Sequence, residues 1–290
     1  MLLRARHFEF SFPRSTVLMG IVNVTPDSFS DGGQFLQPKA AVGLGLKLAA
    51  EGAEIIDIGG ESSRPGALPV TEAEELRRVI PVIEQLSAQL QVAVSVDTVK
   101  PTVARAALAA GASIINDIQA NRHDDAMWRV VAEHRAGYVC VHMQGTPQTM
   151  QSNPVYDDVV REEREFFLDR IQRLKDCGIG PEQLILDPGI GFGKTLEQNL
   201  QLLTTLRDLI TLGRPVLLGV SRKSFIGKLL GIQPEHRLPA TLACECFAVQ
   251  DGIQIIRTHD VAASLQAIRM TEAILVEQKQ NVAHGSKSLA

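Results

Sequence analysis

Short apolar runs recur along the 290 residues of the chain, and a stretch with helical spacing follows each of them. Consecutive positions within a run are apolar and often β-branched, which is typical of strands buried on both faces of a parallel sheet. Between the runs the spacing becomes helical, since Val160, Phe167, Ile171 and Leu174 share one helical face. The predicted strands are residues 17–22, 54–58, 92–96, 113–115, 138–141, 183–186, 215–220 and 253–256.

Eight strands that alternate with helices predict an α/β fold, a single-domain (β/α)8 TIM barrel, because parallel neighbours need helical crossovers. An open doubly wound sheet is the alternative, but no G-x-G-x-x-G follows the first strand. Pro81 lies inside one helical segment, so we expect a kink or a break there. We assign residues 1–280 to the barrel and the polar residues 281–290 to a flexible C-terminal tail.

The composition is that of an ordinary globular protein, with 45% hydrophobic residues, 21% charged residues and a net charge of −4. No basic field suggests nucleic acid, and no apolar run approaches membrane-spanning length. The N-terminal segment lacks the apolar stretch of a signal peptide, and the four cysteines form no C-x-x-C pair. These features favour a cytoplasmic protein with neither a nucleic-acid nor a membrane partner.

Polar side chains follow all eight predicted strands. In chain order they are Asn23, the loop 59–64, Asp97, Asn116 with Asp117, His142, Asp187, the segment 221–224, and Arg257 with His259. In a TIM barrel these positions open onto the C-terminal face, where active sites lie, so we expect them to converge on one pocket. His142 has two interpretations, a contact of the bound ligand or a packing histidine.

The residue types in this pocket suggest what it binds. Asp97, Asn116 and Asp187 are short hydrogen-bonding groups that suit a flat heterocycle with an amidine-like edge, such as a pterin or a guanine, and Lys223 could donate to its carbonyl. Arg257 and His259, with Arg64 in the second loop, suit an anion. The pattern therefore predicts a heterocycle pocket beside an anion pocket, without choosing the heterocycle.

The stretch GFGKT, residues 191–195, resembles the end of a phosphate-binding P-loop. A P-loop needs a glycine where this chain has Pro188, and the preceding Asp187 would repel a phosphate. We therefore exclude a P-loop, and we assign no catalytic role to Lys194 or Thr195.

The loops 23–33 and 59–67 are long or glycine-rich, which is typical of loops that close over a ligand.

Eight motifs, in order along nearly the whole chain, resemble those of the dihydropteroate synthase family. The motifs are NVTPDSFSDGG, DIGGESSRPGA, SVDT, IIND, HMQG, LDPGIGFGK, GVSRKSFIG and IIRTHD. The first of them and SRKSFIG are specific to that enzyme. One position departs from the family pattern, since Ser63 replaces the usual threonine, which keeps the hydroxyl but loses a methyl group.

The resemblance implies condensation of 6-hydroxymethyl-7,8-dihydropterin diphosphate with 4-aminobenzoate. The products are 7,8-dihydropteroate, an intermediate of folate synthesis, and pyrophosphate. The resemblance also implies Mg²⁺ as cofactor, sensitivity of the family to sulfonamides, and a homodimer formed through barrel helices.

Site roles carry over from the family position by position. The pterin would be held by Asp97, Asn116, Asp187 and Lys223, and the diphosphate by Asn23, Ser63, Arg64, Arg257 and His259. The 4-aminobenzoate would be framed by Phe29, Ser63, Arg64, Pro65, Phe192, Lys223 and Ser224. Asn23, assisted by Asp31, would bind Mg²⁺, and the catalytic residues would be Asp97, Asp187, Lys223, Arg257 and His259.

Two other functions fit a pterin-binding barrel. A methyltetrahydrofolate-dependent methyltransferase shares the barrel but would lack the NVTPDSFSDGG loop and the SRKSFIG stretch, which are both present. A non-catalytic pterin-binding paralogue should have lost groups such as Arg257 or His259, and both are retained.

Overall fold

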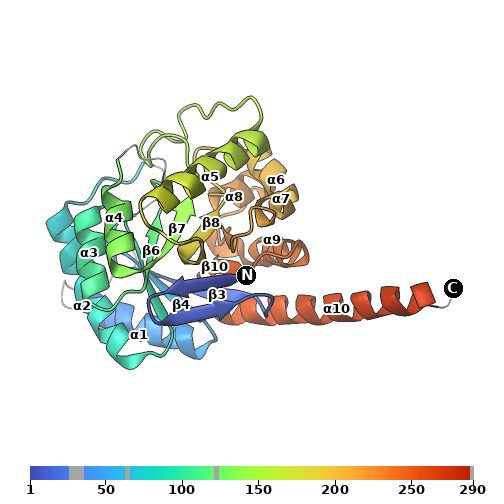
Figure 1. Cartoon of the computed structure of the whole chain (residues 1–290), viewed down its shortest axis with the longest axis horizontal. Coiled ribbons are helices and arrows are strands. Elements are labelled where there is room, and N and C mark those ends of the chain that lie inside the picture. Colours follow the sequence, from blue (N-terminus) through green and yellow to red (C-terminus); the bar gives the residue numbers. More distant parts are fainter. Residues whose placement is uncertain (26–35, 63–65, 121–123, 288–290) are drawn as a thin grey trace.

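The computed structural model describes residues 1–25, 36–62, 66–120 and 124–287 of the chain (Figure 1). Eight parallel strands form one sheet in the order β8-β7-β6-β5-β4-β3-β10-β9. They are β3 (Val17–Asn23), β4 (Ile55–Gly59), β5 (Ala93–Asp97), β6 (Ile114–Asp117), β7 (Gly137–Val141), β8 (Leu184–Asp187), β9 (Leu217–Gly219) and β10 (Ile255–Thr258). A parallel bridge between Leu186 and Val216 joins the two edges, so the sheet closes into the predicted barrel.

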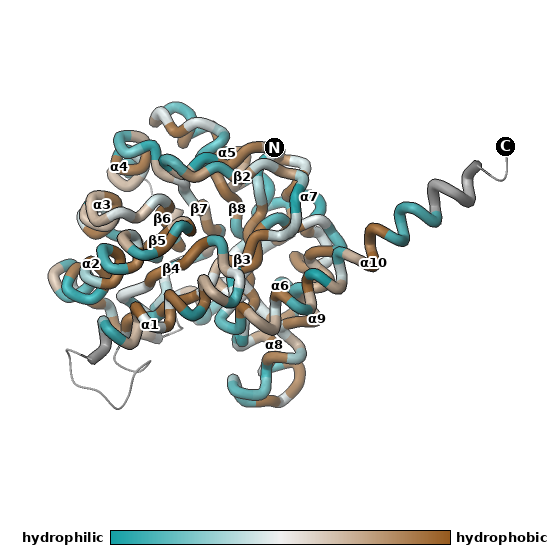
Figure 2. Tube along the Cα trace, turned by 90° about the horizontal axis from the view of Figure 1, so that it is seen from below, coloured by the Kyte–Doolittle hydropathy of each residue, from teal (hydrophilic) through white to brown (hydrophobic). Residues whose placement is uncertain are grey.

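Helices follow the strands and surround the barrel, as Figures 1 and 2 show. They are α1 (Leu36–Ala50), α2 (Glu72–Gln89), α3 (Pro101–Ala109), α4 (Ala126–His134), α5 (Val159–Asp176), α6 (Leu196–Thr204), α7 (Leu206–Ile210), α8 (Ser224–Leu230), α9 (Leu238–Gln250) and α10 (Val261–Lys287). In the described part of the chain, short 3-10 helices also span Pro181–Gln183 and Pro234–His236. The predicted single-domain (β/α)8 architecture is confirmed.

An N-terminal hairpin, β1 (Leu2–Ala5) and β2 (Phe8–Ser11), precedes the barrel and was not predicted. Its buried Leu3 and Phe10 belong to the same apolar cluster as Val17, Ile55 and Ile255, which are the first residues of β3, β4 and β10. The hairpin therefore closes the N-terminal end of the barrel and leaves the opposite end for ligands.

Alternation along the strands separates a packed interior from a polar mouth. In β4 the inward positions read Ile55, Asp57, Gly59, and in β5 they read Ala93, Ser95, Asp97, with Gly59 beside Asp97 in the register. Successive side chains on a strand point to opposite faces, so the inward set changes from apolar to polar toward the carboxyl end. This change places the hydrogen-bonding groups at the C-terminal face.

Of the two outcomes predicted at Pro81, a kink or a break, the break is wrong, because helix α2 continues from Glu72 to Gln89, while the kink stays a prediction. Proline removes one backbone hydrogen bond, but the buried apolar face of α2, which includes Val79, Val82 and Ile83, holds the helix against the barrel. At the C-terminus, α10 continues to Lys287, beyond the predicted domain boundary at residue 280, and projects away from the barrel in both views (Figures 1 and 2). The predicted mobility of residues 281–290 stays a prediction.

Candidate active site

Arg257 on β10 bridges two carboxylates at the mouth of the barrel. Its Nε donates to Asp57 Oδ2 at 2.7 Å and its Nη2 to Asp97 Oδ2 at 3.0 Å. Burial is the largest single influence and disfavours the guanidinium charge, but the attraction of Asp57, Asp97 and Asp187 together with the hydrogen bond to Asp57 outweighs it and raises the pKa of Arg257. Arg257 therefore holds the ends of β4 and β5 together through one side chain.

Asp57 is the site residue that the sequence analysis missed. It is fully buried in β4, and its Oδ2 also accepts a hydrogen bond from Asn116 Nδ2 at 3.0 Å. One carboxylate oxygen therefore positions both Arg257 and Asn116. The available signal was the charged residue inside the apolar strand IIDIG, since a buried carboxylate needs partners.

Two buried oxygens in this group have no hydrogen-bond partner within the described part of the chain. They are Asp57 Oδ1 and Asn116 Oδ1. Buried acceptors without partners are rare and costly in native proteins, so each needs an explanation. Because Asn116 already donates through its nitrogen to Asp57, its oxygen is oriented to accept an N–H from a ligand.

Asp97 and Asp187 both have a pKa above the usual range for aspartate. Burial is the main cause in each case, because it destabilises the charged form. Arg257 opposes the shift at Asp97, while Lys223 and a 2.7 Å hydrogen bond from the Gly189 N–H oppose it at Asp187. Such perturbed carboxyl groups in a cleft are typical of functional sites.

Lys223 stands between β9 and α8 and contacts the loop that follows β8. Its Nζ donates to the carbonyl oxygen of Ile190 and lies 4.4 Å from the ring centre of Phe192. Burial lowers the pKa of Lys223 to about 7, although Asp187 favours the charged form. Ser224 follows directly as the first residue of α8 and is exposed.

His259 and Asn23 lie at the ends of neighbouring strands, β10 and β3. Both the backbone N–H and the Nδ1 of His259 contact Ser221 Oγ, at 3.2 and 2.9 Å, which fixes the ring beside β9. Asn23 pairs with Gly59 in the sheet, and its carboxamide forms no hydrogen bond within residues 1–25, 36–62, 66–120 and 124–287. Its oxygen can therefore serve as a ligand for a cation.

Five of the predicted site residues lie outside the described residues. They are Phe29, Asp31, Ser63, Arg64 and Pro65.

Two other strand-end groups lie in the outer layer instead of the mouth. Asp117 accepts a hydrogen bond from the buried Tyr138 hydroxyl at 2.8 Å, and the His142 ring packs 5.0 Å from the ring of Phe166 on α5. The expectation that all eight strand ends converge is therefore wrong for the end of β7. At the end of β6 it holds for Asn116 but not for Asp117, and His142 matches the packing interpretation.

The described part of the chain contains no helix that is both long and apolar enough to cross a membrane.

Comparison with known proteins places the chain among pterin-binding enzymes. Residues 19–259 match the family model described as "Pterin binding enzyme". The chain is 47% identical to dihydropteroate synthase from Escherichia coli strain K12 over 258 residues, which cover 89% of this chain and 91% of that protein.

Solved structures give the same result. Dihydropteroate synthase from Yersinia pestis, in a sulfonamide drug complex, has a TM-score of 0.89 at 43% identity, covering 95% of this chain and 100% of that one. The Xanthomonas albilineans enzyme in complex with 7,8-dihydropteroate has a TM-score of 0.85 at 46% identity, covering 95% of this chain and 99% of that one.

Proposed function

This chain belongs to the dihydropteroate synthase family, and we propose that it joins 6-hydroxymethyl-7,8-dihydropterin diphosphate to 4-aminobenzoate. The products are 7,8-dihydropteroate and pyrophosphate, and the reaction is a transferase step of folate biosynthesis. One observation carries the proposal: Asn116, whose buried oxygen has no partner among the described residues, stands beside Asp97 in the sheet, and Lys223 interacts with Asp97, Asp187 and Arg257 at the same mouth. A relative that holds 7,8-dihydropteroate supports the same substrates here.

The pterin ring occupies the carboxylate-lined part of the mouth in this proposal. Asp187 and Asn116 accept hydrogen bonds from the amidine-like edge of the ring. Asp97 accepts a hydrogen bond from a further N–H of the ring, and Lys223 donates one to the ring carbonyl. Lys223 leaves the Ile190 carbonyl oxygen to make this bond. The buried Asn116 oxygen that has no partner among the described residues then accepts from the substrate.

The diphosphate lies at the cationic side of the mouth, against Arg257, His259 and Asn23. The contacts of Arg257 with Asp57 and Asp97 use its Nε and Nη2, so Nη1 remains for a phosphate oxygen. Ser63 and Arg64 are assigned to the same subsite by family resemblance.

Magnesium fits this subsite as an ion shared between protein and substrate. No group of three or more His, Cys, Asp or Glu side chains could hold a metal by itself in the described ranges. Mg²⁺ commonly takes one or two protein oxygens and completes its shell with substrate phosphates and water. The Asn23 carboxamide oxygen, with Asp31 from the first loop, would supply the protein ligands. When bound, the ion would neutralise charge on the leaving pyrophosphate.

The 4-aminobenzoate lies at the outer edge, between the loop after β8 and the start of α8. Phe192 offers an apolar face, Lys223 stands over that ring, and Ser224 is exposed next to it. Phe29, Ser63, Arg64 and Pro65 complete this subsite in the proposal. The arrangement puts the amine of 4-aminobenzoate near the pterin methylene group.

The reaction is dissociative and needs no protein nucleophile. The C–O bond between the pterin methylene and the diphosphate breaks first, and pyrophosphate takes the bonding electrons. Asp97 and Asp187 stabilise the positive charge that spreads over the pterin. Arg257 and His259 stabilise the negative charge of the departing pyrophosphate. The amine nitrogen of 4-aminobenzoate then forms the C–N bond and releases a proton.

A homodimer is proposed to form through the outer faces of α9 and α10. Phe247, Met270 and Ile274 are 46%, 63% and 57% exposed, although each is a large apolar residue. Exposed apolar patches of this kind mark interaction sites, and two-fold dimers use the same patch on both copies. A cytoplasmic location stays a prediction.

The function is tested by pyrophosphate release from the purified protein supplied with the pterin diphosphate. We expect pyrophosphate and dihydropteroate, identified by mass, only when both 4-aminobenzoate and Mg²⁺ are present. Pterin binding without product would favour the non-catalytic paralogue. Transfer of a methyl group from methyltetrahydrofolate, with no dihydropteroate, would favour the methyltransferase.

A further inference from the structure

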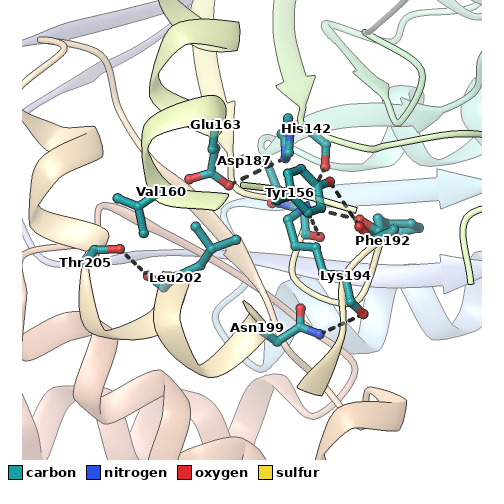
Figure 3. A network of polar contacts seen from close by, with 12 residues as sticks. His142, Tyr156, Val160, Glu163, Asp187, Phe192, Lys194, Asn199, Leu202 and Thr205 are labelled. Atoms are coloured by element: carbon teal, nitrogen blue, oxygen red, sulfur yellow. Dashed lines mark hydrogen bonds and ion pairs between the residues drawn. The ribbon is translucent and has the colours of Figure 1, made fainter. Parts of the chain in front are cut away.

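Lys194 is a buried cation behind the loop that follows β8. It is 1% exposed, and its ammonium donates to the carbonyl oxygens of His142, Gly189 and Phe192 at 3.2, 3.1 and 3.1 Å. Figure 3 shows the side chain reaching into this polar network from the start of α6. An ammonium has three donors and no acceptor, so the three carbonyl oxygens use its full capacity.

The loop 188–193 packs directly on the segment that follows β7. A Cβ added at Gly189 would lie 2.0 Å from the His142 carbonyl oxygen, and one added at Gly193 would lie 2.5 Å from that of Gln144. Both glycines have positive φ, at +61° and +60°. Main chain therefore lies against main chain, and Lys194 supplies donors to carbonyl oxygens on both sides of the contact.

The other side of the same loop carries the proposed substrate groups. The Gly189 N–H holds Asp187 Oδ1, the Ile190 carbonyl oxygen accepts from Lys223, and the Phe192 ring lies beside the Lys223 ammonium. Any shift of the loop backbone therefore moves three of the groups assigned to pterin and 4-aminobenzoate.

Further contacts tie the loop to helices outside the barrel. Asn199 Oδ1 on α6 accepts from the Gly191 N–H at 2.6 Å, and the Tyr156 hydroxyl donates to the Gly193 carbonyl oxygen at 3.0 Å. Glu163 on α5, buried beside His142, attracts the Lys194 charge. The polar network is thus continuous from α5 and α6 to the loop (Figure 3).

We propose that Lys194 is a positioning residue, whose ammonium fixes the 188–193 backbone so that Asp187, Phe192 and Lys223 hold 4-aminobenzoate in line with the pterin. The inference rests on the proposed function. Lys194 contacts no substrate in this arrangement and acts through the loop. Its effect is therefore larger on 4-aminobenzoate, because Phe192 and Lys223 both line that subsite. The pterin diphosphate also uses Asp187 and Lys223, but it keeps its contacts with Asp97, Asn116 and Arg257, which stand on other strands.

The test is Lys194→Met, which keeps the unbranched apolar stem of the side chain and removes its donors. We expect the KM for 4-aminobenzoate to rise, so that kcat/KM for this substrate falls on the order of 10- to 100-fold, the size of effect that small misplacement of reacting groups produces. The KM for the pterin diphosphate should change by less than about threefold, because most of its contacts remain. An unchanged KM for 4-aminobenzoate in folded Lys194→Met would overturn the proposal.

Two controls separate positioning from general destabilisation. Lys175→Met removes an exposed lysine at the end of α5 and should leave both KM values unchanged. Ile83→Ala opens a cavity in the buried face of α2 and should lower the melting temperature without the selective change in KM. The same selective change in Ile83→Ala would contradict a specific role for Lys194.

Tyr156→Phe keeps the proposal testable if Lys194→Met does not fold. It removes one hydrogen bond to the same loop, at the Gly193 carbonyl oxygen, and should raise the KM for 4-aminobenzoate by a smaller factor in the same direction. No change would count against the loop mechanism. Absence of product from the unmodified protein would instead refute the proposed function.

Discussion

Asp57 holds two proposed ligand groups with a single oxygen atom, since Arg257 Nε and Asn116 Nδ2 both donate to its Oδ2. Because the residue is fully buried, these donors replace water as the hydrogen-bond partners of its Oδ2. The geometry of the mouth therefore depends on a side chain that touches neither proposed substrate subsite directly.

Asp57→Asn should weaken both folding and activity. Arg257 and Asn116 now donate to a charged carboxylate oxygen, and in the variant they would face either an N–H group or a neutral oxygen. We therefore expect the free energy of unfolding to fall by on the order of 3 kcal/mol. We also expect kcat/KM to fall about 100-fold, because Arg257 loses one of its two anchors. Urea unfolding and steady-state kinetics measure the two effects. Asp208→Asn, at an exposed position of α7, is the control and should change neither.

Asp97→Asn tests the electrostatic part of the mechanism. It removes one of the negative charges that stabilise the cation on the pterin. The activation barrier should therefore rise by several kcal/mol, which is on the order of the loss caused by removing one electrostatic stabiliser of a transition state. The measurement is single-turnover formation of dihydropteroate at saturating substrate. Turnover near that of the unmodified protein would exclude this role for Asp97.

At the scale of elements, the backbone of the loop after β8 is closely packed against the segment that follows β7. Gly189 combines a positive φ with a neighbouring carbonyl oxygen that leaves no room for a methyl group. The loop conformation thus requires glycine for two independent reasons.

Gly189→Ala should destabilise the protein by about 3 kcal/mol or more, from backbone strain plus the clash with the His142 carbonyl oxygen. Gly213→Ala is the matched control, because its φ is +74° but no atom lies within 4 Å of an added Cβ. The control should cost about 1 kcal/mol, from strain alone. Equal losses in thermal unfolding would mean that the close approach at Gly189 has no energetic importance.

Glu163 on α5, which is buried beside His142 after β7, should make the stability of the fold depend on pH. Burial raises the pKa of Glu163 from 4.5 to about 8, although Lys194 opposes the shift. Between these values the folded chain keeps a proton that the unfolded chain has lost, so the stabilising contribution of Glu163 falls as pH rises. One such group changes the free energy of unfolding by at most about 1.4 kcal/mol per pH unit.

Glu163→Gln cannot titrate and should flatten this dependence. The difference in unfolding free energy between the unmodified chain and the variant should therefore decrease from about pH 5 to about pH 8, which urea unfolding at several pH values measures. Glu235→Gln, at an exposed position, should leave the slope unchanged. A variant slope equal to that of the unmodified chain would show that Glu163 does not change protonation between the states.

For the whole molecule, the open question is what covers the apolar side chains on α9 and α10. Ile274→Glu places a charge in the proposed dimer interface, so the variant should sediment as a monomer at concentrations where the unmodified protein is a dimer. Leu168→Glu, at a 49% exposed apolar position on α5, is the control and should remain dimeric. A monomeric unmodified protein would refute the interface.

The sequence by itself determined the barrel, because eight apolar runs alternate with helical segments and parallel strands require such crossovers. It also brought Asp97, Asn116, Asp187 and Arg257 to one face, since the carboxyl ends of all barrel strands point the same way. These inferences need only the order of elements, and the order is written in the local pattern.

Only the tertiary structure decided which side of each strand faces the pocket. Strands buried on both faces show no alternation of polar and apolar residues, and a shift of one residue reverses the direction of a side chain. His142 and Asp117 consequently turned outward, while Asp57 turned inward. The burial of Lys194 was equally hidden, because the carbonyl oxygens that bind it come from segments about 50 residues apart along the chain, which only folding brings together.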